Sequence, residues 1–513
     1  MKFSLRYPFW VFGLVLLWRV ALLVFTAQPI PANDAFFFDG PVVNYLLNGH
    51  YINPAAAEVM QISGRQVYSA YPPLYQAVLC VWMMVFGTSA LAAMWLHLVL
   101  FAVSGCLVLA IIKKLFPPLM SLAPALVFFF GMTFMDRPDD LGHTLGLLSL
   151  WLVARLISGQ GSWPTSVALA AALSSALYSS VMVGTVYFGM GFLAVTVTWW
   201  FRRRLAMFIP FVATAGLFVA VTSAIAVFEP VWWQGFLENS AQTPIRTLGI
   251  RAPHLMDILK LIRTAPLFLL AAALLPFVLS RYWRLSFEPW LALLAGVFLM
   301  GLVTLVATMT VISPDYTTYL LFAQVILAVG MLVLVEKLQP DFKRSMRLAL
   351  VACALLISIR FIGMTTWGAA CAWKNSYGHT QATLRAELAP FNQTNLPVII
   401  SSPYLYQAFN VGTRRPIHFD WYYNHATAAT QSDLAKLIVL RPPKLVLTQF
   451  DYYRSVLPLL NRLWQQPELV MVRVRDFARV RTPDSIPSLQ RVVQHISWAP
   501  VIVDLDWKKP PTP

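Results

Sequence analysis

Charge is scarce in this sequence. Only 12% of the 513 residues are Asp, Glu, Lys or Arg, and 58% are hydrophobic, whereas soluble domains have about 25% charged residues. A chain this apolar cannot expose most of its surface to water, which excludes a soluble globular protein, a disordered chain and a coiled coil. The composition indicates an integral membrane protein.

Cysteine and the common cofactor motifs are also scarce. The four cysteines, Cys80, Cys106, Cys353 and Cys371, are too few and too far apart for a disulfide framework or a zinc knuckle. No His-x-x-x-His pair, Cys-x-x-Cys, Gly-x-Gly-x-x-Gly or phosphate-loop pattern occurs, which argues against zinc protease, redox, dinucleotide and ATPase functions. The net charge of +16 is scattered between apolar blocks and forms no single basic face, so we expect no nucleic-acid partner.

Long uncharged runs predict about eleven transmembrane helices, because a bilayer core needs about 20 apolar residues per helix. The runs lie near 8–27, 74–113, 117–134, 141–158, 164–178, 181–201, 205–228, 264–280, 289–312, 316–335 and 346–364. The second run divides at Gly87-Thr88 into a short helix and a full span, and Ser179-Ser180 is the only break between the fifth and sixth runs. The chain is therefore expected to be a polytopic α-helical membrane protein.

Basic residues fall in every second connection between these runs, beginning with Lys2 and Arg6 ahead of the first. Short loops rich in Lys and Arg stay on the cytoplasmic side. This rule places 28–73, 135–140, 229–263, 313–315 and everything after 364 outside. In a bacterium the protein would lie in the inner membrane and these segments in the periplasm.

After residue 364 the sequence becomes less apolar and contains short β-type runs separated by Pro-rich turns. We expect transmembrane residues 1–364 to be followed by a periplasmic α/β domain at 365–513, with strands near 396–400, 444–448, 470–474 and 501–503 and helices at 404–410 and 452–464. This domain has 16 basic and 9 acidic residues. Its positive charge would favour contact with anionic membrane lipid.

Acidic residues gather in the first two outer loops. Asp34 follows the first span by a few residues and precedes three phenylalanines, where partial desolvation would make its carboxylate a better general base. The alternative is an N-cap for a helix beginning near Ala35.

The second loop, 135–140, carries Asp136, Arg137, Asp139 and Asp140 in six residues. One acid there can cap the next helix and Arg137 can neutralise another, but the remaining charge favours phosphate, metal or hydroxyl binding.

Basic and aromatic side chains mark the later outer segments. Loop 229–263 includes Arg246, Arg251, His254 and Arg263 together with tryptophans, which suits an anionic lipid headgroup; a solvated loop is the alternative. Tyr316 and Tyr319 lie at the same level. Arg360, near the outer end of the last span, and Arg19 in the first need partners, which a structural ion pair or a bound phosphate would supply. His97 and His143 are expected to be packing residues between helices.

The order of these features resembles that of the GT-C glycosyltransferases, polytopic enzymes that take a sugar from a polyprenyl-phosphate donor. The resemblance rests on an outer loop opening with Asp34, then Leu-Leu-x-Gly-x-Tyr at 46–51, Tyr-Pro-Pro-Leu at 71–74, Arg-Pro-Asp at 137–139 and Asp-Tyr-Thr-Thr-Tyr-Leu at 315–320. It covers the layout of residues 1–365 and includes protein mannosyltransferases and the aminoarabinose transferases of lipid A.

The resemblance implies an inverting transfer of a hexosyl or pentosyl group to a lipid, glycan or protein acceptor. Asp34 matches the catalytic base, and Asp139 with Asp136 matches the second acidic loop. Basic and tyrosine residues would neutralise the departing lipid phosphate: Arg137, Tyr71, Arg246, Arg251, His254, Arg263, Tyr316, Tyr319 and Arg360. The chain has Ala35 and Tyr71 where relatives carry Glu and Lys, so a lysine contact to phosphate is missing and the sequence does not require a divalent metal.

Three other functions are compatible with the composition. A transporter or flippase for a lipid-linked or polysaccharide intermediate would carry charges near the bilayer midplane and two related halves. A receptor or assembly protein would leave the six-residue acidic loop unexplained. A different membrane transferase or ligase with a lipid-linked substrate would use the same outer acids. We find no internal repeat and few midplane charges, which favours the glycosyltransferase.

Overall fold

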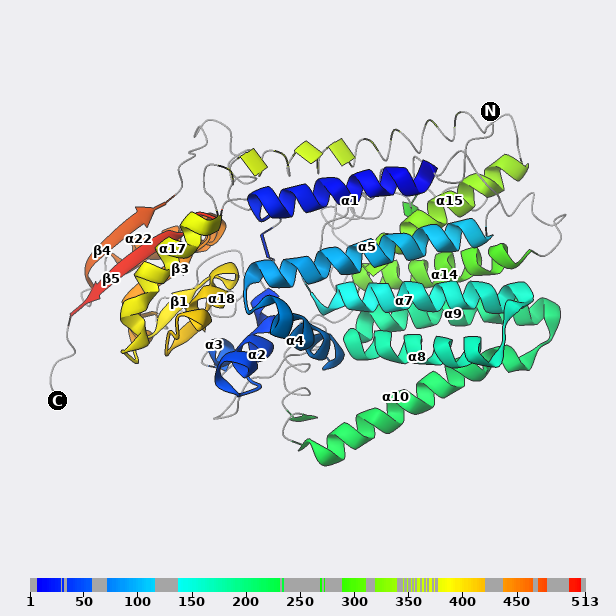
Figure 1. Cartoon of the computed structure of the whole chain (residues 1–513), viewed down its shortest axis with the longest axis horizontal. Helices are drawn as coiled ribbons and strands as arrows, with labels where there is room; N and C mark the ends of the chain where they lie inside the picture. The colour runs from blue at the N-terminus through cyan, green and yellow to red at the C-terminus, as the bar shows by residue number, and fades with distance from the viewer. Residues whose placement is uncertain are drawn as a thin grey trace. The chain divides into compact units, whose positions relative to one another are not determined.

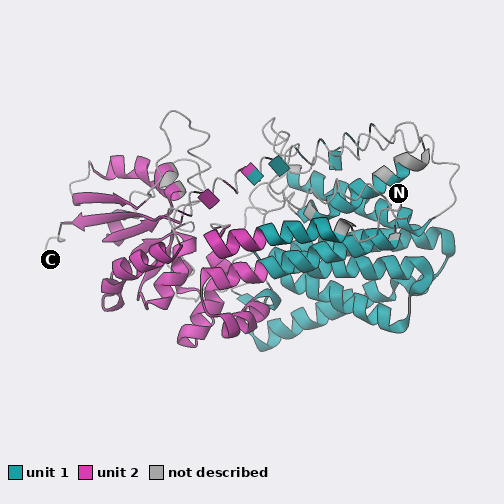
Figure 2. Cartoon of the chain, turned by 45° about the horizontal axis from the view of Figure 1, so that its top comes forward, with its two compact units in different colours: residues 1–18, 70–75, 98–362 teal, residues 19–69, 76–97, 363–513 magenta. Residues whose placement is uncertain are grey.

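The computed structural model describes residues 7–28, 30–31, 35–57, 72–115, 137–230, 233–234, 268–269, 272, 288–310, 319–338, 377–419, 437–464, 469–477 and 498–508, with single positions between 345 and 373. Two compact units divide the chain (Figure 2). Unit 1 contains residues 1–18, 70–75 and 98–362, and unit 2 contains residues 19–69, 76–97 and 363–513. The predicted domain boundary at 364 remains a prediction; unit 2 combines the C-terminal segment with the first outer loop.

Within the described residues, six helices are long and apolar enough to cross a membrane: Phe9–Thr26, Ala90–Lys114, Pro138–Gln160, Val181–Arg202, Leu205–Phe228 and Pro289–Thr308. The chain is thus a multi-pass membrane protein, as its composition predicts. The full helices are α1 (Tyr7–Thr26), α5 (Ala90–Leu115), α7 (Pro138–Arg155), α9 (Val181–Arg202), α10 (Ile209–Phe228) and α14 (Pro289–Thr310), all labelled in Figure 1.

Further described helices are α4 (Leu74–Phe86), α8 (Trp163–Ser179), α15 (Leu321–Leu338), a π-helical turn η1 (Leu156–Gln160) and a 3-10 turn η2 (Leu205–Phe208). The expected run 117–134 lies outside the described residues, and so do most of 264–280 and 346–364. The number of about eleven transmembrane helices therefore stays a prediction.

Both expected breaks are confirmed. Gly87 separates α4 from α5 in a left-handed conformation, with φ +85°, which glycine adopts without strain. Ser180 separates α8 from α9 in an extended conformation, and its hydroxyl accepts a hydrogen bond from the Val183 amide at 3.4 Å. A serine hydroxyl at this position satisfies one of the free amides at the start of α9.

In unit 1, α7, α8, α9 and α14 run side by side (Figure 1). Close approach depends on small residues, as is usual between helices in lipid. A Cβ atom on Gly296 of α14 would lie 2.3 Å from the Met190 carbonyl of α9, and one on Gly146 of α7 would lie 2.2 Å from the Tyr187 ring. Neither position has room for a side chain, so these glycines set the spacing of the helices.

Unit 2 contains a five-stranded mixed sheet in the order β2-β1-β3-β5-β4. Its strands are β1 (Val398–Ile400), β2 (Pro416–His418), β3 (Lys444–Leu447), β4 (Leu469–Asp476) and β5 (Val501–Trp507). The pairs β2-β1 and β1-β3 are parallel, whereas β3-β5 and β5-β4 are antiparallel. Four strands agree with the predicted ones. Strand β2 was not predicted; it is an edge strand beginning at a proline, and an edge is one of the few sheet positions that proline tolerates.

Helices of the same unit are α2 (Ala35–Asn48), α3 (Pro54–Ala57), α17 (Tyr377–Leu388), η6 (Ala389–Asn392), α18 (Ser402–Asn410), α21 (Gln449–Asp451), η7 (Tyr452–Val456) and α22 (Leu457–Leu463). Helix α18 connects the parallel strands β1 and β2, and α21 to α22 follow β3. These two helical segments confirm the expected ones, and the architecture of the C-terminal residues is α/β. Helix α17 was not predicted.

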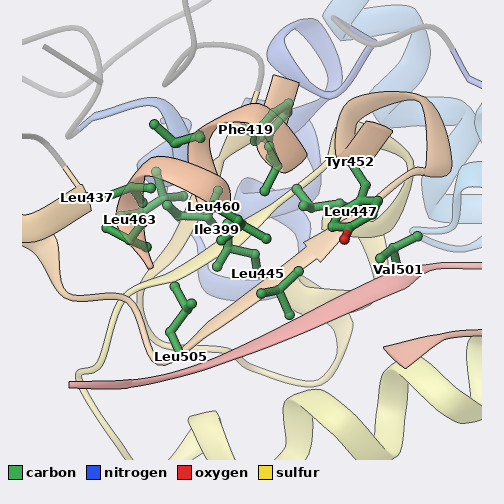
Figure 3. Close-up of a cluster of buried hydrophobic side chains, with 14 residues drawn as sticks. Ile399, Phe419, Leu437, Leu445, Leu447, Tyr452, Leu460, Leu463, Val501 and Leu505 are labelled. Carbon is green, nitrogen blue, oxygen red and sulfur yellow. The ribbon is translucent and has the colours of Figure 1, made fainter. Parts of the chain in front are cut away.

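The core of this α/β part is apolar. Ile399, Leu445 and Val503 from three neighbouring strands and Leu459 and Leu463 from α22 are fully buried (Figure 3). Burying side chains of this size stabilises a fold by roughly 1.5–3 kcal/mol each. All residues of β1 and β3 are buried, which explains the apolar runs at 398–400 and 445–447.

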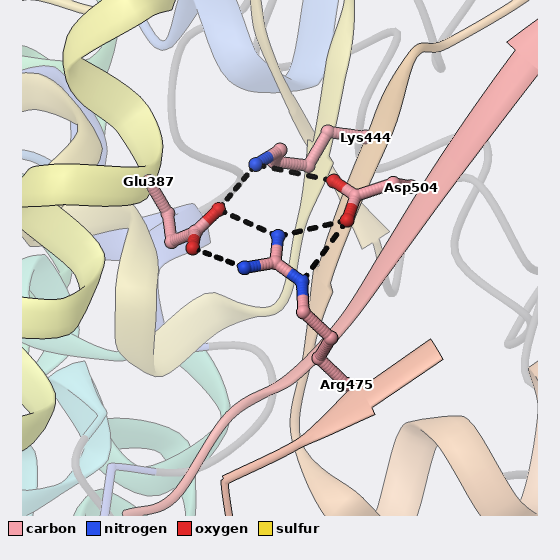
Figure 4. Close-up of polar contacts among 4 residues, drawn as sticks. All are labelled: Glu387, Lys444, Arg475 and Asp504. Atoms are coloured by element: carbon pink, nitrogen blue, oxygen red, sulfur yellow. Dashed lines mark hydrogen bonds and ion pairs between the residues drawn. The ribbon is translucent and has the colours of Figure 1, made fainter. Parts of the chain in front are cut away.

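Four charged side chains form a cluster of ion pairs beside β3 and β5 (Figure 4). Arg475 donates to both oxygens of Glu387, at 2.5 and 2.8 Å, and to Asp504 at 2.8 and 3.1 Å. Lys444 contacts Glu387 and lies 3.2 Å from Asp504. The side chains are 11 to 31% exposed. The hydrogen bonds from Arg475 are the main reason that the pKa of Glu387 falls from 4.5 to about 2.

This cluster predicts a pH-dependent stability. A carboxyl whose pKa is lowered by folding stabilises the fold above its unfolded value, and the contribution is lost as the pH falls from about 4.5 towards 2. Glu387→Gln should therefore destabilise the sheet of unit 2 by about 1–3 kcal/mol at pH 7, after allowance for solvent screening. The difference from wild type should shrink below pH 4.5, measured by thermal unfolding of the full chain in detergent. Asp506→Asn, at an exposed acid of β5, is the control and should match wild type at every pH; an equal loss in both variants would contradict the prediction.

Candidate active site

The first outer segment is folded into helix α2, which begins at Ala35, where the sequence predicted a helix start. Asp34 itself lies outside the described residues. Helix α2 is buried from Ala35 to Asn44, including the carboxylate of Asp39, whose side chain is 1% exposed. The hydroxyl of Tyr406 donates a hydrogen bond to Asp39 at 2.5 Å. A buried carboxylate needs such a donor, because leaving water costs it several kcal/mol.

The Leu-Leu-x-Gly-x-Tyr motif forms the end of α2. Gly49 takes a left-handed conformation, φ +76°, and its amide bonds to the Tyr45 carbonyl at 2.8 Å. The Tyr51 hydroxyl then donates to Gln76 of α4 at 2.8 Å, and Gln76 donates to the Phe38 carbonyl at 3.3 Å. This motif therefore ends the helix and connects it to α4, which is a structural role.

The second outer loop leads directly into α7. Arg137 is the N-cap residue, with extended backbone, and Pro138 is the first helical residue. Asp139 is fully buried: its Oδ1 accepts a hydrogen bond from the Ser180 hydroxyl at 2.6 Å, and its Oδ2 lies 3.4 Å from Nε of Arg137. The expected neutralisation of one acid by Arg137 is confirmed. Neither Asp139 nor Asp140 is the N-cap residue of α7, so the capping alternative is wrong.

The Asp139 carboxylate lies in the first turn of α7, where the helix dipole is positive, and has a hydroxyl and a guanidinium beside it. Arg137 is 21% exposed. A buried carboxylate that holds a partly exposed guanidinium can present that cation to an anionic group. Asp139 is thus suited to orient Arg137.

One turn further along α7, His143 is fully buried. Its Nδ1 lies 3.1 Å from the Tyr187 hydroxyl, and the two rings meet edge to face at 5.7 Å. This confirms the sequence interpretation of His143 as a packing residue between helices. Its surroundings are aromatic and include the Phe322 ring at 5.4 Å.

Several predicted site residues are outside the described part of the chain. These are Asp34, Asp136, Tyr71, Arg246, Arg251, His254, Arg263, Tyr316 and Arg360. Tyr319 is described and is buried, 2% exposed, just before α15. Among the residues the structure describes, Arg137 and Asp139 are the predicted pair that it brings together. No group of three His, Cys, Asp or Glu side chains in that part could hold a metal ion.

Four polar residues of these clusters were not selected from the sequence. Asp39 was passed over although it lies five residues after Asp34, and Ser180 was noted only as a helix break. Ser402 accepts a hydrogen bond from the Phe36 amide at 3.0 Å, and Tyr406 binds Asp39, both from the C-terminal segment. Sequence separations of 366 and 367 residues leave no local pattern from which these contacts could be read.

No protein-family model matches the chain, and no curated protein matches it. Solved structures do. Two crystal structures of ArnT from Cupriavidus metallidurans align over 96% of this chain and 97% of theirs: one bound to undecaprenyl phosphate, at 16% identity and TM-score 0.48, and one in the apo state, at 14% and 0.43. A crystal structure of the Archaeoglobus fulgidus oligosaccharyltransferase, in complex with Zn and sulfate, aligns over 88% of this chain and 70% of that chain, at 10% identity and TM-score 0.50.

Of these three alignments, the archaeal one reaches a TM-score of 0.5, and at 10% identity it is evidence of a shared fold alone. This chain therefore shares the fold of the archaeal oligosaccharyltransferase over most of its length. Its own structure combines membrane-length helices with a small C-terminal α/β sheet.

Proposed function

We propose that the chain is a membrane glycosyltransferase that moves a sugar from a polyprenyl-phosphate donor to an acceptor hydroxyl on the periplasmic side of the inner membrane. The observation that carries this proposal is the fold shared with the archaeal oligosaccharyltransferase over 88% of the chain. The polyprenyl-phosphate donor is inferred from the sequence motifs of the first two outer loops, which resemble those of the GT-C glycosyltransferases. A donor dissolved in the bilayer also accounts for a site built on membrane-spanning helices.

Asp34 is proposed as the general base. It directly precedes α2, whose first ten residues are buried, so the peptide that carries it is anchored to a packed element. In the reaction the acceptor oxygen attacks the anomeric carbon and its proton passes to the Asp34 carboxylate. The bond from that carbon to the phosphate oxygen breaks, and polyprenyl phosphate leaves. A single displacement of this kind inverts the anomeric centre.

Arg137 is proposed to stabilise the departing phosphate, with Asp139 holding its guanidinium. Phosphate is a good leaving group that needs charge stabilisation and exclusion of water. The burial of Asp139 and its bonds to Ser180 and Arg137 support this division of roles. The remaining cations and tyrosines of the outer loops are proposed to complete the phosphate site. No step of the proposed reaction passes through a metal ion.

The first test addresses the base. Asp34→Asn should lower transfer at least about 1,000-fold, because an amide cannot accept the proton, while membrane insertion and purified yield stay normal. The assay would supply radiolabelled undecaprenyl-phosphate pentoses and hexoses and membrane extracts as acceptor. Glu58→Gln, at an acid of the same outer segment with no proposed role, is the control. Near-normal turnover by Asp34→Asn would remove this residue from the mechanism.

Removing the carboxylate that holds Arg137 should lower activity about 100-fold or more, the range that one electrostatic group supplies. The variant is Asp139→Ala, compared with Asp140→Asn in the same helical turn, which should stay within about threefold of wild type. Ser180→Ala should have a smaller effect, about 3- to 10-fold, since the ion pair with Arg137 remains. Less than a threefold loss in Asp139→Ala would leave Asp139 with a structural role alone.

Donor binding tests the third outer loop. Arg251→Ala and Arg263→Ala should each weaken the affinity for undecaprenyl phosphate about tenfold, because each removes a charge-assisted contact to the phosphate. Binding would be measured by thermal stabilisation of the purified protein over a range of lipid concentrations. Unchanged affinity in both variants would place the donor phosphate elsewhere.

A further inference from the structure

One face of helix α18 carries three polar residues, two of which contact α2 and the third the turn between α4 and α5. Ser402, Tyr406 and Asn410 are spaced four residues apart and therefore lie on the same side of the helix. Ser402 accepts a hydrogen bond from the Phe36 amide at 3.0 Å, and Tyr406 donates to Asp39 at 2.5 Å. Asn410 donates to the Thr88 carbonyl at 2.6 Å. The C-terminal sheet domain and helix α2 are thus joined within unit 2.

Aromatic packing surrounds these hydrogen bonds. The Phe36 ring meets Tyr406 edge to face at 4.8 Å and lies 5.0 Å from Phe409. Phe36 and Ser402 are fully buried, and Tyr406 is 2% exposed. Buried hydrogen bonds of this kind cannot be replaced by water without cost. The contact is therefore suited to hold α2 in one position relative to α18.

The other end of the segment that carries Asp34 is held by the same domain. Helix α1 ends before Ala27, which has a left-handed backbone, φ +50°. The indole of Trp498, 1% exposed and just before β5, donates to the Ala27 carbonyl at 2.8 Å. Residues 28–35, which include Asp34, are therefore bounded by two hydrogen bonds to the C-terminal domain, one at Ala27 and one at Phe36.

The bond from Phe36 has a chemical consequence for the proposed base. A helix begins with four amides that lack partners within the helix, and the residue before it ordinarily accepts a bond from the second or third of them. Phe36 is the second residue of α2, so the Ser402 hydroxyl occupies one of the two amides that an N-cap carboxylate at position 34 would use. A carboxylate bound to such amides is a weaker base.

We propose that α18 is a positioning element of the active site: Ser402 caps α2, and Tyr406 anchors it through Asp39, so that the start of the helix that follows the proposed base Asp34 is held in place. This inference rests on the proposed function. It gives the C-terminal domain a role in catalysis without any contact of its own with the substrate.

Two pairs of variants separate positioning from domain stability. Ser402→Ala and Tyr406→Phe remove the hydroxyls that contact α2. Their controls remove equally buried hydroxyls whose partners lie inside the C-terminal domain. Ser401→Ala loses the bond to Asp451 at 2.5 Å, and Tyr404→Phe loses the bond to the Trp498 carbonyl at 3.1 Å. All four are made in the full chain and assayed in nanodiscs with the undecaprenyl-phosphate donor that the wild type uses.

We expect Ser402→Ala and Tyr406→Phe to lower kcat at least about tenfold with donor KM within about twofold, because misplacing the base affects the chemical step. The controls should stay within about threefold of wild type. In Ser402→Ala the acid limb of the pH profile should also move to lower pH, by about half a unit or more, because the vacated amide then binds the carboxylate at position 34. A purely structural loss would lower the amount of active enzyme and leave the pH profile unchanged.

Hydrogen exchange tests the contact without any assay of transfer. Amides at the start of α2 should exchange at least about tenfold faster in Ser402→Ala than in Ser401→Ala. Wild-type kcat and pH profile in Ser402→Ala and Tyr406→Phe, or equal losses in their controls, would overturn the positioning role. A wild type inactive with every donor would instead refute the proposed function, and unchanged exchange of α2 would refute the contact itself.

Discussion

A carboxylate removed from water must find its hydrogen-bond donors inside the protein, and this requirement governs both outer segments described above. Asp39 and Asp139 are 1% and 0% exposed. Leaving either without donors would cost several kcal/mol, a large part of the stability of any domain. The donors come from far along the chain: Ser180 for Asp139 and Tyr406 for Asp39. Each buried acid therefore enforces a tertiary contact, and the path of each outer segment follows from it.

The two acids use this constraint differently. Asp139 lies at the start of a membrane helix and holds Arg137, so burial there produces an oriented cation at the edge of the helical unit. Asp39 lies inside α2 and binds a hydroxyl from α18, so burial there joins the first outer segment to the C-terminal domain. In the proposed transferase, one contact prepares the site for a leaving phosphate, and the other fixes the peptide that follows the base.

The C-terminal sheet of unit 2 has an apolar core of its own. Its strands and α22 pack around Ile399 and Leu445, and two of its cations, Lys444 and Arg475, are neutralised by Glu387 and Asp504. The positive balance inferred from composition therefore comes from the other basic residues of this segment. A domain with its own core gives α18 a rigid base from which to hold α2.

Local sequence patterns predicted much of this architecture. The apolar runs located α1, α5, α7, α9, α10 and α14 within a few residues, because bilayer thickness sets the length of such runs. The strands β1 and β3 were recognisable because strands that are buried throughout have short apolar runs in their sequence. Two elements show no strong hydrophobic periodicity and were not predicted. They are strand β2, which is three residues long, and helix α17, which has few apolar side chains. At the site, Arg-Pro-Asp was found because four charged residues crowd a six-residue loop.

By itself, then, the sequence determines where the chain is apolar enough to cross a membrane, where its helices break, and which acids lie too close to the bilayer surface to be ordinary surface residues. These properties depend on neighbours a few positions away. Only the tertiary structure decides which donor each buried acid receives, that Asp139 binds Ser180, that Asp39 is buried at all, and that a serine and a tyrosine more than 360 residues away hold α2. Such pairings depend on distance through space, and a hydroxyl that will find a carboxylate looks in the sequence like any other hydroxyl.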